Sequence, residues 1–195
     1  MKKISALLAT LLVSITNYAH AIPFKFEDDI FYANDVVFAH FTLTEARDVS
    51  LWTDSCKNLV NFDPNITLWK ADGTKIGHND DDASVGPNQT FGDAGLVVPA
   101  LAAGDYIVTL AMFNNWALGD KLTDGFEFDY YAKTTLSDWH LEFGTSGGPS
   151  WSLWLSDVDD AHVSSPSNSV PEPAPLALLL AGLMALGVKR KRRHA

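Results

Sequence analysis

The stretch ITLWKADGTKIGH, residues 66–78, decides the fold class of this chain. Apolar and polar residues alternate over 66–70, as they do in a strand that buries one face. Asp72 and Gly73 predict a turn, because glycine adopts positive φ without steric cost. A second strand is expected over 74–78, so the stretch is typical of an all-β fold.

The same alternation recurs in short runs along the chain, and no run between its two ends keeps a helical period for long. The further strands that it predicts cover residues 38–44, 49–54, 96–101, 106–113, 126–131, 139–143 and 151–155. Turns rich in Gly, Pro, Asn and Asp divide them. About eight short strands of this kind predict a β-sandwich or jelly roll.

The N-terminus has the three parts of a secretory signal peptide. Lys2 and Lys3 form a positive start, residues 4–15 are mostly apolar, and Ala19-His20-Ala21 has the small-x-small pattern of a signal-peptidase site. We therefore expect a signal helix within 1–21, cleavage by signal peptidase after Ala21, and export of the mature chain.

The C-terminus, VPEPAPLALLLAGLMALGVKRKRRHA over 170–195, combines a proline motif, an apolar run and a basic end. The apolar run, 174–188, is shorter than the roughly 20 residues of a standard transmembrane helix. The basic end, 189–193, stays on the cytoplasmic side by the positive-inside rule, which puts the motif at the outer face of the membrane. On hydropathy alone, the tail could also be an ordinary single-span anchor.

This tail resembles the PEP-CTERM sorting signal of exosortase-bearing Gram-negative bacteria. The resemblance covers 170–195 and rests on Pro171, Glu172 and Pro173, the hydrophobic helix and the Arg-rich end. It implies that an exosortase cleaves near the motif. The protein would then be anchored transiently in the inner membrane before it reaches the cell surface or the extracellular space.

Both ends are thus targeting segments, which leaves one domain over 22–163 and a polar linker over 164–169. Residues 22–169 hold seven Lys and Arg against 23 Asp and Glu. A surface this acidic repels nucleic acid and attracts cations, so a nucleic-acid partner is not expected. The single cysteine, Cys56, is either a free thiol in a loop or an intermolecular link.

Three further segments resemble the β-sandwich of bacterial pre-peptidase C-terminal domains: FTLTEARDVSLWTDS, NFDPNITLWKADGTKIGHNDDD and LAAGDYIVTLAMF. The resemblance covers about residues 35–113 and implies the same sandwich fold. WSLWLSDVDDA, 151–161, is similar to the closing strand of such exported proteins. Residues 114–150 match nothing in the family.

The densest set of oxygen ligands in the domain is acidic. Its members are Asp63, Asn79, Asp80, Asp81 and Asp82. Ca²⁺ prefers carboxylate and carbonyl oxygens, so this set is a candidate calcium site, although the glycine and the distant Glu of an EF-hand loop are absent. The alternative is that these residues cap turns and keep an edge solvated.

One stretch, Gly144 to Gly148, satisfies the G-x-S-x-G pattern of a nucleophile elbow. That motif needs a helix after it, whereas a proline and an alternating strand follow here, so a glycine-rich turn is expected. The histidines His40, His78, His140 and His162 form no metal-binding spacing. His40 and His140 fall on polar phases and are expected at the surface.

Two tryptophans, Trp52 and Trp154, also fall on the polar phases of their strands. An exposed aromatic face can stack on a sugar, so these residues are candidate glycan contacts. The alternative is that a loop covers them. The sequence therefore predicts an exported, non-enzymatic structural or adhesive protein of the envelope or of a biofilm matrix. Its rival is a binding module dependent on carbohydrate or Ca²⁺, with exopolysaccharide as a candidate partner.

Overall fold

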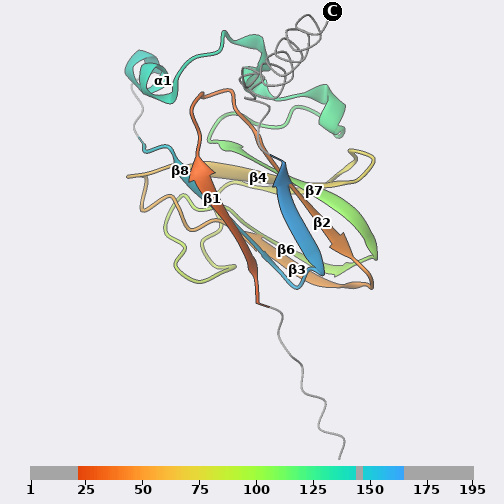
Figure 1. Cartoon of the computed structure of the whole chain (residues 1–195). Helices are drawn as coiled ribbons and strands as arrows, with labels where there is room; N and C mark the ends of the chain where they lie inside the picture. The colour runs from red at the N-terminus through yellow and green to blue at the C-terminus, as the bar shows by residue number, and fades with distance from the viewer. Residues whose placement is uncertain (1–21, 144–146, 165–195) are drawn as a thin grey trace, which may run out of the picture.

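The computed structural model describes residues 22–143 and 147–164 as two antiparallel β-sheets packed face to face, with short helices at one end (Figure 1). This confirms the predicted all-β class. The predicted signal peptide, 1–21, and sorting signal, 170–195, lie outside the described residues. Within the described ranges, no helix is long and apolar enough to span a membrane.

Sheet 1 contains, in spatial order, β1 (Phe24–Asp29), β8 (Ser150–Ser156), β3 (Arg47–Trp52) and β6 (Gly95–Leu101). Sheet 2 contains β5 (Lys75–Asn79), β4 (Pro64–Lys70), β7 (Gly104–Met112), β2 (Val37–Leu43) and β9 (Asp160–Ser164). All pairings are antiparallel. Seven of these nine strands coincide, within a few residues, with strands predicted from alternation.

The core lies between the two sheets and is built from the apolar phase of each strand. In β2, burial alternates residue by residue, with Val37, Ala39, Phe41 and Leu43 facing inward. Leu153 of β8 belongs to the same buried cluster from the opposite sheet. Removal of this apolar area from water is the main favourable term in the free energy of folding.

The predicted turn at Asp72 and Gly73 joins β4 to β5. Gly73 has a φ of 76°, which disfavours any residue with a Cβ. Its N–H donates to the Lys70 carbonyl oxygen at 2.8 Å, and the Thr74 N–H donates to Asp72 Oδ1 at 2.9 Å. Local turn chemistry therefore fixes this strand pair.

Two predicted strands, 126–131 and 139–143, are wrong. The chain forms the 3₁₀ helix η2 (Glu127–Tyr130) and the helix α1 (Leu136–Phe143), after a first 3₁₀ helix, η1 (Leu122–Asp124). Helix α1 begins after Thr135, whose Oγ1 accepts a hydrogen bond from the Asp138 N–H at 3.2 Å. A threonine in this place caps a helix, and the apolar residues from 136 onward then follow a helical period.

Two edge strands were not predicted. β1 is the edge of sheet 1 and β9 is the edge of sheet 2. β1 is mostly charged and exposed, a composition that protects an edge from pairing with other chains. Ser164 pairs with Phe38, so it belongs to β9 and the predicted linker begins one residue later.

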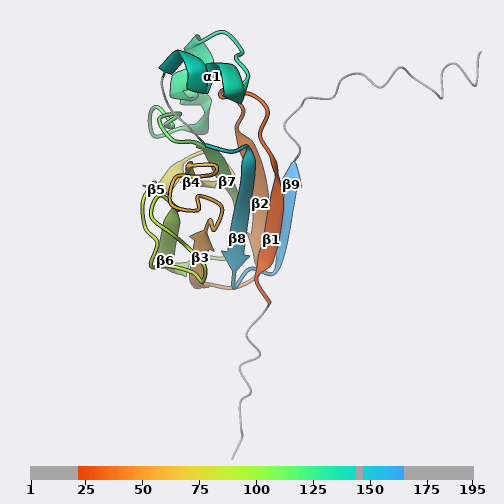
Figure 2. The ribbon, with the colours of Figure 1, turned by 90° about the vertical axis from the view of Figure 1, so that its left-hand side faces the viewer.

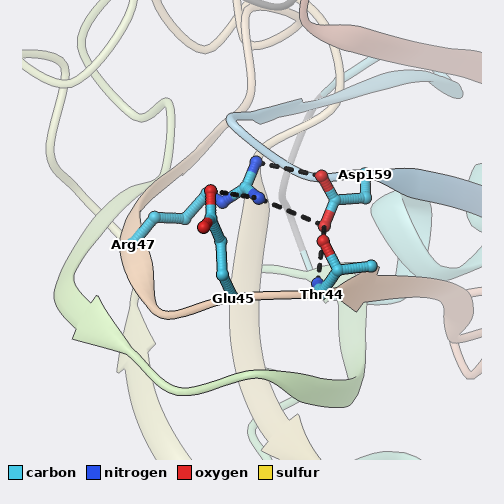
Figure 3. A network of polar contacts seen from close by, with 4 residues as sticks. All are labelled: Thr44, Glu45, Arg47 and Asp159. Atoms are coloured by element: carbon cyan, nitrogen blue, oxygen red, sulfur yellow. Dashed lines mark hydrogen bonds and ion pairs between the residues drawn. The ribbon is translucent and has the colours of Figure 1, made fainter.

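The two chain crossings at the end away from α1 are tied together by one carboxylate (Figure 3). Asp159, between β8 and β9, accepts hydrogen bonds from the N–H and Oγ1 of Thr44, both at 2.6 Å. Arg47 forms an ion pair with Asp159 at 3.0 Å and another with Glu45 at 3.2 Å. The bonds from Thr44 and then the Arg47 charge lower the pKa of Asp159. Both crossings pass between sheets 1 and 2, so this contact links the two layers.

Candidate functional site

The outer face of sheet 1 holds both candidate tryptophans. Trp52 of β3 and Trp154 of β8 are directly paired, and their rings stack in parallel with centroids 5.6 Å apart. Lys25 of β1 places its Nζ 5.3 Å from the centroid of the Trp154 ring. The three strands thus present a row of one cation and two rings.

The expected exposure of Trp52 is wrong, because only 4% of the residue is accessible. The loop after β5 lies over its ring, and Gly86 is so close that a Cβ there would clash with the indole. Trp154 is half-buried. The alternative from the sequence, a tryptophan covered by a loop, therefore holds for Trp52, and Trp154 alone keeps an accessible edge.

A groove of about 340 Å³ lies beside this row, which we call the polar groove. Its lining residues are Lys25, Glu27, Asp28, Asp29, Asp54, Ser55, Lys57, Asn61, Ser150, Trp151 and Ser152. They come from β1, from β8 and from the loop that follows β3. Cross-strand pairing explains part of the set, since Glu27 faces Ser152 and Asp29 faces Ser150.

Hydrogen bonds hold the walls of the polar groove in place. Ser152 Oγ donates to Asp54 Oδ1 at 2.5 Å, and the Asp54 N–H donates to Ser152 Oγ at 3.1 Å. Asn61 Nδ2 donates to the carbonyl oxygens of Ser55 at 3.0 Å and of Ser150 at 2.7 Å. Side chains fixed in this way need little reordering when a ligand binds.

One wall group of the polar groove lacks a partner. Ser55 is only 5% accessible, and its Oγ makes no hydrogen bond within the described structure. A buried hydroxyl without a partner costs about 1–3 kcal/mol, so such groups are uncommon. The hydroxyl has almost no accessible surface, so it lies behind the groove wall and not in contact with a ligand in the groove.

The groove carries more negative than positive charge. Glu27, Asp28, Asp29 and Asp54 contribute carboxylates, whereas Lys25 and Lys57 contribute the cations. Lys25 forms a close ion pair with Glu27. The hydrogen bond from Lys25 to Glu27, together with the charges of Glu27 and Asp54, raises the pKa of Lys25. The groove thus combines fixed acceptors with a lysine donor.

The predicted calcium ligands divide into two groups. Asn79 and Asp82 hold loop backbone: Asn79 Oδ1 accepts from the Gly95 N–H at 3.0 Å, and Asp82 Oδ1 accepts from the Ser84 N–H at 3.0 Å. The hydrogen bonds from Ser84 lower the pKa of Asp82. Asp82 thus has the turn-capping role that the sequence left as the alternative, whereas Asn79 links the end of β5 to the start of β6.

Asp63, Asp80 and Asp81 form the second group and repel one another. Burial, then the charges of Asp81 and Asp93, raises the pKa of Asp63 to about 6. Burial, then Asp81 and Asp63, raises the pKa of Asp80 to about 7. Asp80 Oδ1 is buried and unbonded in the described structure.

Among the described residues, no set of three or more His, Cys, Asp or Glu side chains is arranged to hold a metal ion. Calcium binding at these carboxylates stays a prediction.

Asp93, which the sequence reasoning missed, is fully buried and joins two loops. Its Oδ1 accepts from Thr53 Oγ1 at 3.1 Å and from the Cys56 N–H at 3.0 Å. Its Oδ2 accepts from the Thr90 N–H at 2.7 Å and from Thr90 Oγ1 at 2.9 Å. The signal in the sequence was Thr90-Phe91-Gly92-Asp93, where Gly92 has a φ of 86°. The loops around the polar groove depend on this carboxylate.

Cys56 is a buried free thiol in a loop, as one of the two sequence alternatives had it. Its Sγ accepts from the Leu59 N–H at 3.3 Å. Burial raises the pKa of the thiol to about 11, which disfavours the reactive thiolate.

The histidines are less isolated than their sequence spacing suggests. His40 and His162 are directly opposite each other on β2 and β9, with stacked rings 5.1 Å apart. His78 contacts the Trp116 ring, and its Nδ1 is 3.0 Å from Thr67 Oγ1. His140 lies on α1. Part of the G-x-S-x-G stretch, 144–146, lies outside the described residues.

No family model matches the chain, and a search of curated proteins finds no match.

Proposed function

We propose that this protein is exported, sorted to the cell surface through its C-terminal signal, and acts there as a non-catalytic adhesive module that binds polysaccharide in the polar groove. The observation that carries the binding role is the polar groove itself, where carboxylates, including the hydrogen-bonded Asp54, lie beside the Lys25 ammonium group. The N-terminal and C-terminal sequence patterns support export and sorting. We further propose that the sandwich is of the pre-peptidase C-terminal type.

Sugar chemistry matches this groove. Neighbouring hydroxyls of a saccharide donate to carboxylates such as Asp28 and Asp54, and an ammonium group such as that of Lys25 donates to the oxygens of the sugar. Polar walls need such partners, since a buried polar group without one is costly. A volume of about 340 Å³ is at the lower end of ligand pockets, which suits one or two sugar units of a longer chain.

Asp28→Asn tests the binding role without threatening the fold. Asp28 is exposed, and Asn keeps an oxygen that can accept from the Asp29 N–H, so thermal stability is expected to stay unchanged. Loss of the carboxylate is expected to weaken binding to the best saccharide about tenfold, because a hydrogen bond to a charged group is worth about 1.5–3 kcal/mol. A glycan array with the exported protein selects the saccharide, and calorimetry gives the two dissociation constants.

Asp54→Asn removes a second carboxylate from the groove, and its Asn oxygen can still accept the hydrogen bond from Ser152. The matched control is Glu142→Gln, which removes one exposed charge on α1, away from the groove. Weaker binding in the Asp54 variant and unchanged binding in the control are expected. If no saccharide on the array binds, or if Asp28→Asn and Asp54→Asn both bind as tightly as the wild type, the groove is not a polysaccharide site.

The sorting proposal is tested by the intact mass of the protein at the cell surface. The mature protein is expected to lack residues 174–195, because a short apolar run that contains a proline is a marginal permanent anchor. Glu172→Ala is expected to leave full-length protein in the inner membrane, whereas Ser169→Ala, in the adjoining linker, is expected to be processed normally. Surface protein that retains 189–193 would show that the tail is a plain anchor.

A further inference from the structure

A second cavity, of about 570 Å³, lies at the end of the sandwich that carries α1, and we call it the aromatic cavity. Six residues with Phe, Tyr or Trp rings line it: Phe62, Phe113, Phe128, Tyr131, Trp139 and Phe143. Four of them come from residues 126–143, the segment where the chain forms η2 and α1 (Figure 1). The volume falls within the range of small-molecule pockets.

Trp139 and three of the other rings form a continuous wall. The Trp139 ring centroid is 4.3 Å from that of Phe128, 4.2 Å from that of Phe143 and 5.5 Å from that of Tyr131. The Tyr131 ring stands nearly perpendicular to the indole, at 87°. Rings at different inclinations present several faces to the same space. Phe143 and Tyr131 are about half accessible, so the wall is open to solvent on that side.

The charge beside this wall is negative. Asp63 lines the cavity, and none of the described residues that line it is Lys or Arg. His140 also lines it, and burial lowers the pKa of its imidazole, which favours the neutral form at pH 7. Asp63 has a pKa of about 6, so it is mostly ionised at neutral pH, and Asp81 and Asp93 add to the negative potential. Aromatic rings and one acidic residue thus line the same space.

We propose that the aromatic cavity binds an organic cation through a quaternary ammonium or alkylammonium group. Aromatic faces attract such a cation through their quadrupole, and its alkyl surface is easily removed from water. Asp63 supplies the opposite charge. An anion would be repelled by Asp63, and a neutral apolar ligand would bury that carboxylate without compensation. This site is separate from the polar groove and does not depend on polysaccharide binding.

Choline and its neutral isostere 3,3-dimethylbutan-1-ol test the charge requirement, because the two differ in one central atom. The exported protein is titrated with each by calorimetry at pH 7.5 and constant ionic strength. We expect choline to bind at least about tenfold more tightly than the alcohol, in line with a desolvated cation–π contact. Equal affinities, or no binding of either probe, would overturn the proposal.

Two variants test whether the preference for choline over the neutral alcohol arises in the aromatic cavity. Asp63→Asn is expected to reduce the ratio of the two affinities toward one, and it should fold because burial already favours a neutral group there. Phe143→Ala is expected to weaken choline binding several-fold. Tyr130→Ala is the control, since this ring is 81% accessible and does not line the cavity. An unchanged ratio in Asp63→Asn, or equal losses in Phe143→Ala and Tyr130→Ala, would also overturn it.

Discussion

Replacement of Asp93 by Ala is expected to lower the free energy of unfolding by about 3–5 kcal/mol, because it leaves several buried donors without an acceptor. The N–H groups of Cys56 and Thr90 both donate to this carboxylate, and Asp93 has no accessible surface. Urea unfolding of the wild type and the variant, followed by tryptophan fluorescence, gives the difference.

Asp93→Asn separates the loss of charge from the loss of the acceptors. Asn keeps one acceptor oxygen, so we expect an intermediate loss of stability. Asp48→Ala is a control for the removal of an exposed acidic side chain. The Asp48 carboxylate accepts a single hydrogen bond, from the Ala100 N–H. If Asp93→Ala unfolds at the same urea concentration as the wild type, the four hydrogen bonds do not organise the loops.

Replacement of Asp80 by Asn is expected to stabilise the protein at pH 8 by on the order of 2 kcal/mol, a value discounted for partial solvent screening. The pKa of Asp80 is about 7 in the folded state against 3.8 for an ordinary aspartate. Asp80 therefore stays protonated to a higher pH in the folded state than in the unfolded state. Stability falls as the pH rises from about 4 to 7, and the full penalty is present above pH 7.

The variant removes this penalty, which comes from burial of the Asp80 carboxylate and from the charges of Asp81 and Asp63. Thermal unfolding at pH 8 is expected to shift upward by about 5–10 °C, whereas at pH 4 the two proteins should unfold at similar temperatures. Asp82→Asn is the matched control with the opposite sign, because Ser84 lowers the pKa of Asp82. A lower melting temperature for Asp80→Asn at pH 8 would contradict this electrostatic account.

The same variant tests the calcium prediction. A cation bound only by the folded state stabilises it by mass action, so calcium should raise the melting temperature of the wild type more than that of Asp80→Asn. An identical response of both proteins would leave these carboxylates as surface and turn residues.

The strands were predictable because their pattern is local. In β2 the buried and half-buried residues alternate without exception, and the β4–β5 turn has its sequence signal in the adjacent residues Asp72 and Gly73. Residues 139–143 alternate too, and that short window misled the prediction. The helical reading needs Thr135 and Leu136, which supply the cap and the first residue of the apolar period.

The candidate sites were less predictable because they join distant segments. Ser152 meets Asp54 across 98 positions, and Thr53 meets Asp93 across 40. Trp52 was expected at the surface because strand periodicity says which way a side chain points but not what lies above it. A loop that begins some thirty residues later covers it, and Gly86 is the one residue there whose lack of a side chain permits the contact.

The described chain enters the sandwich at Phe24 and leaves it at Ser164, on edge strands of different sheets and at opposite ends (Figure 2). A tensile force between these two points therefore runs along β1 and β9, parallel to the strands. Each strand would have to slide past its neighbour, which breaks several backbone hydrogen bonds at once rather than one after another. Resistance to forced unfolding is set by the unfolding rate. Simultaneous rupture of several bonds makes unfolding slow, so this geometry suits a domain that bears mechanical load.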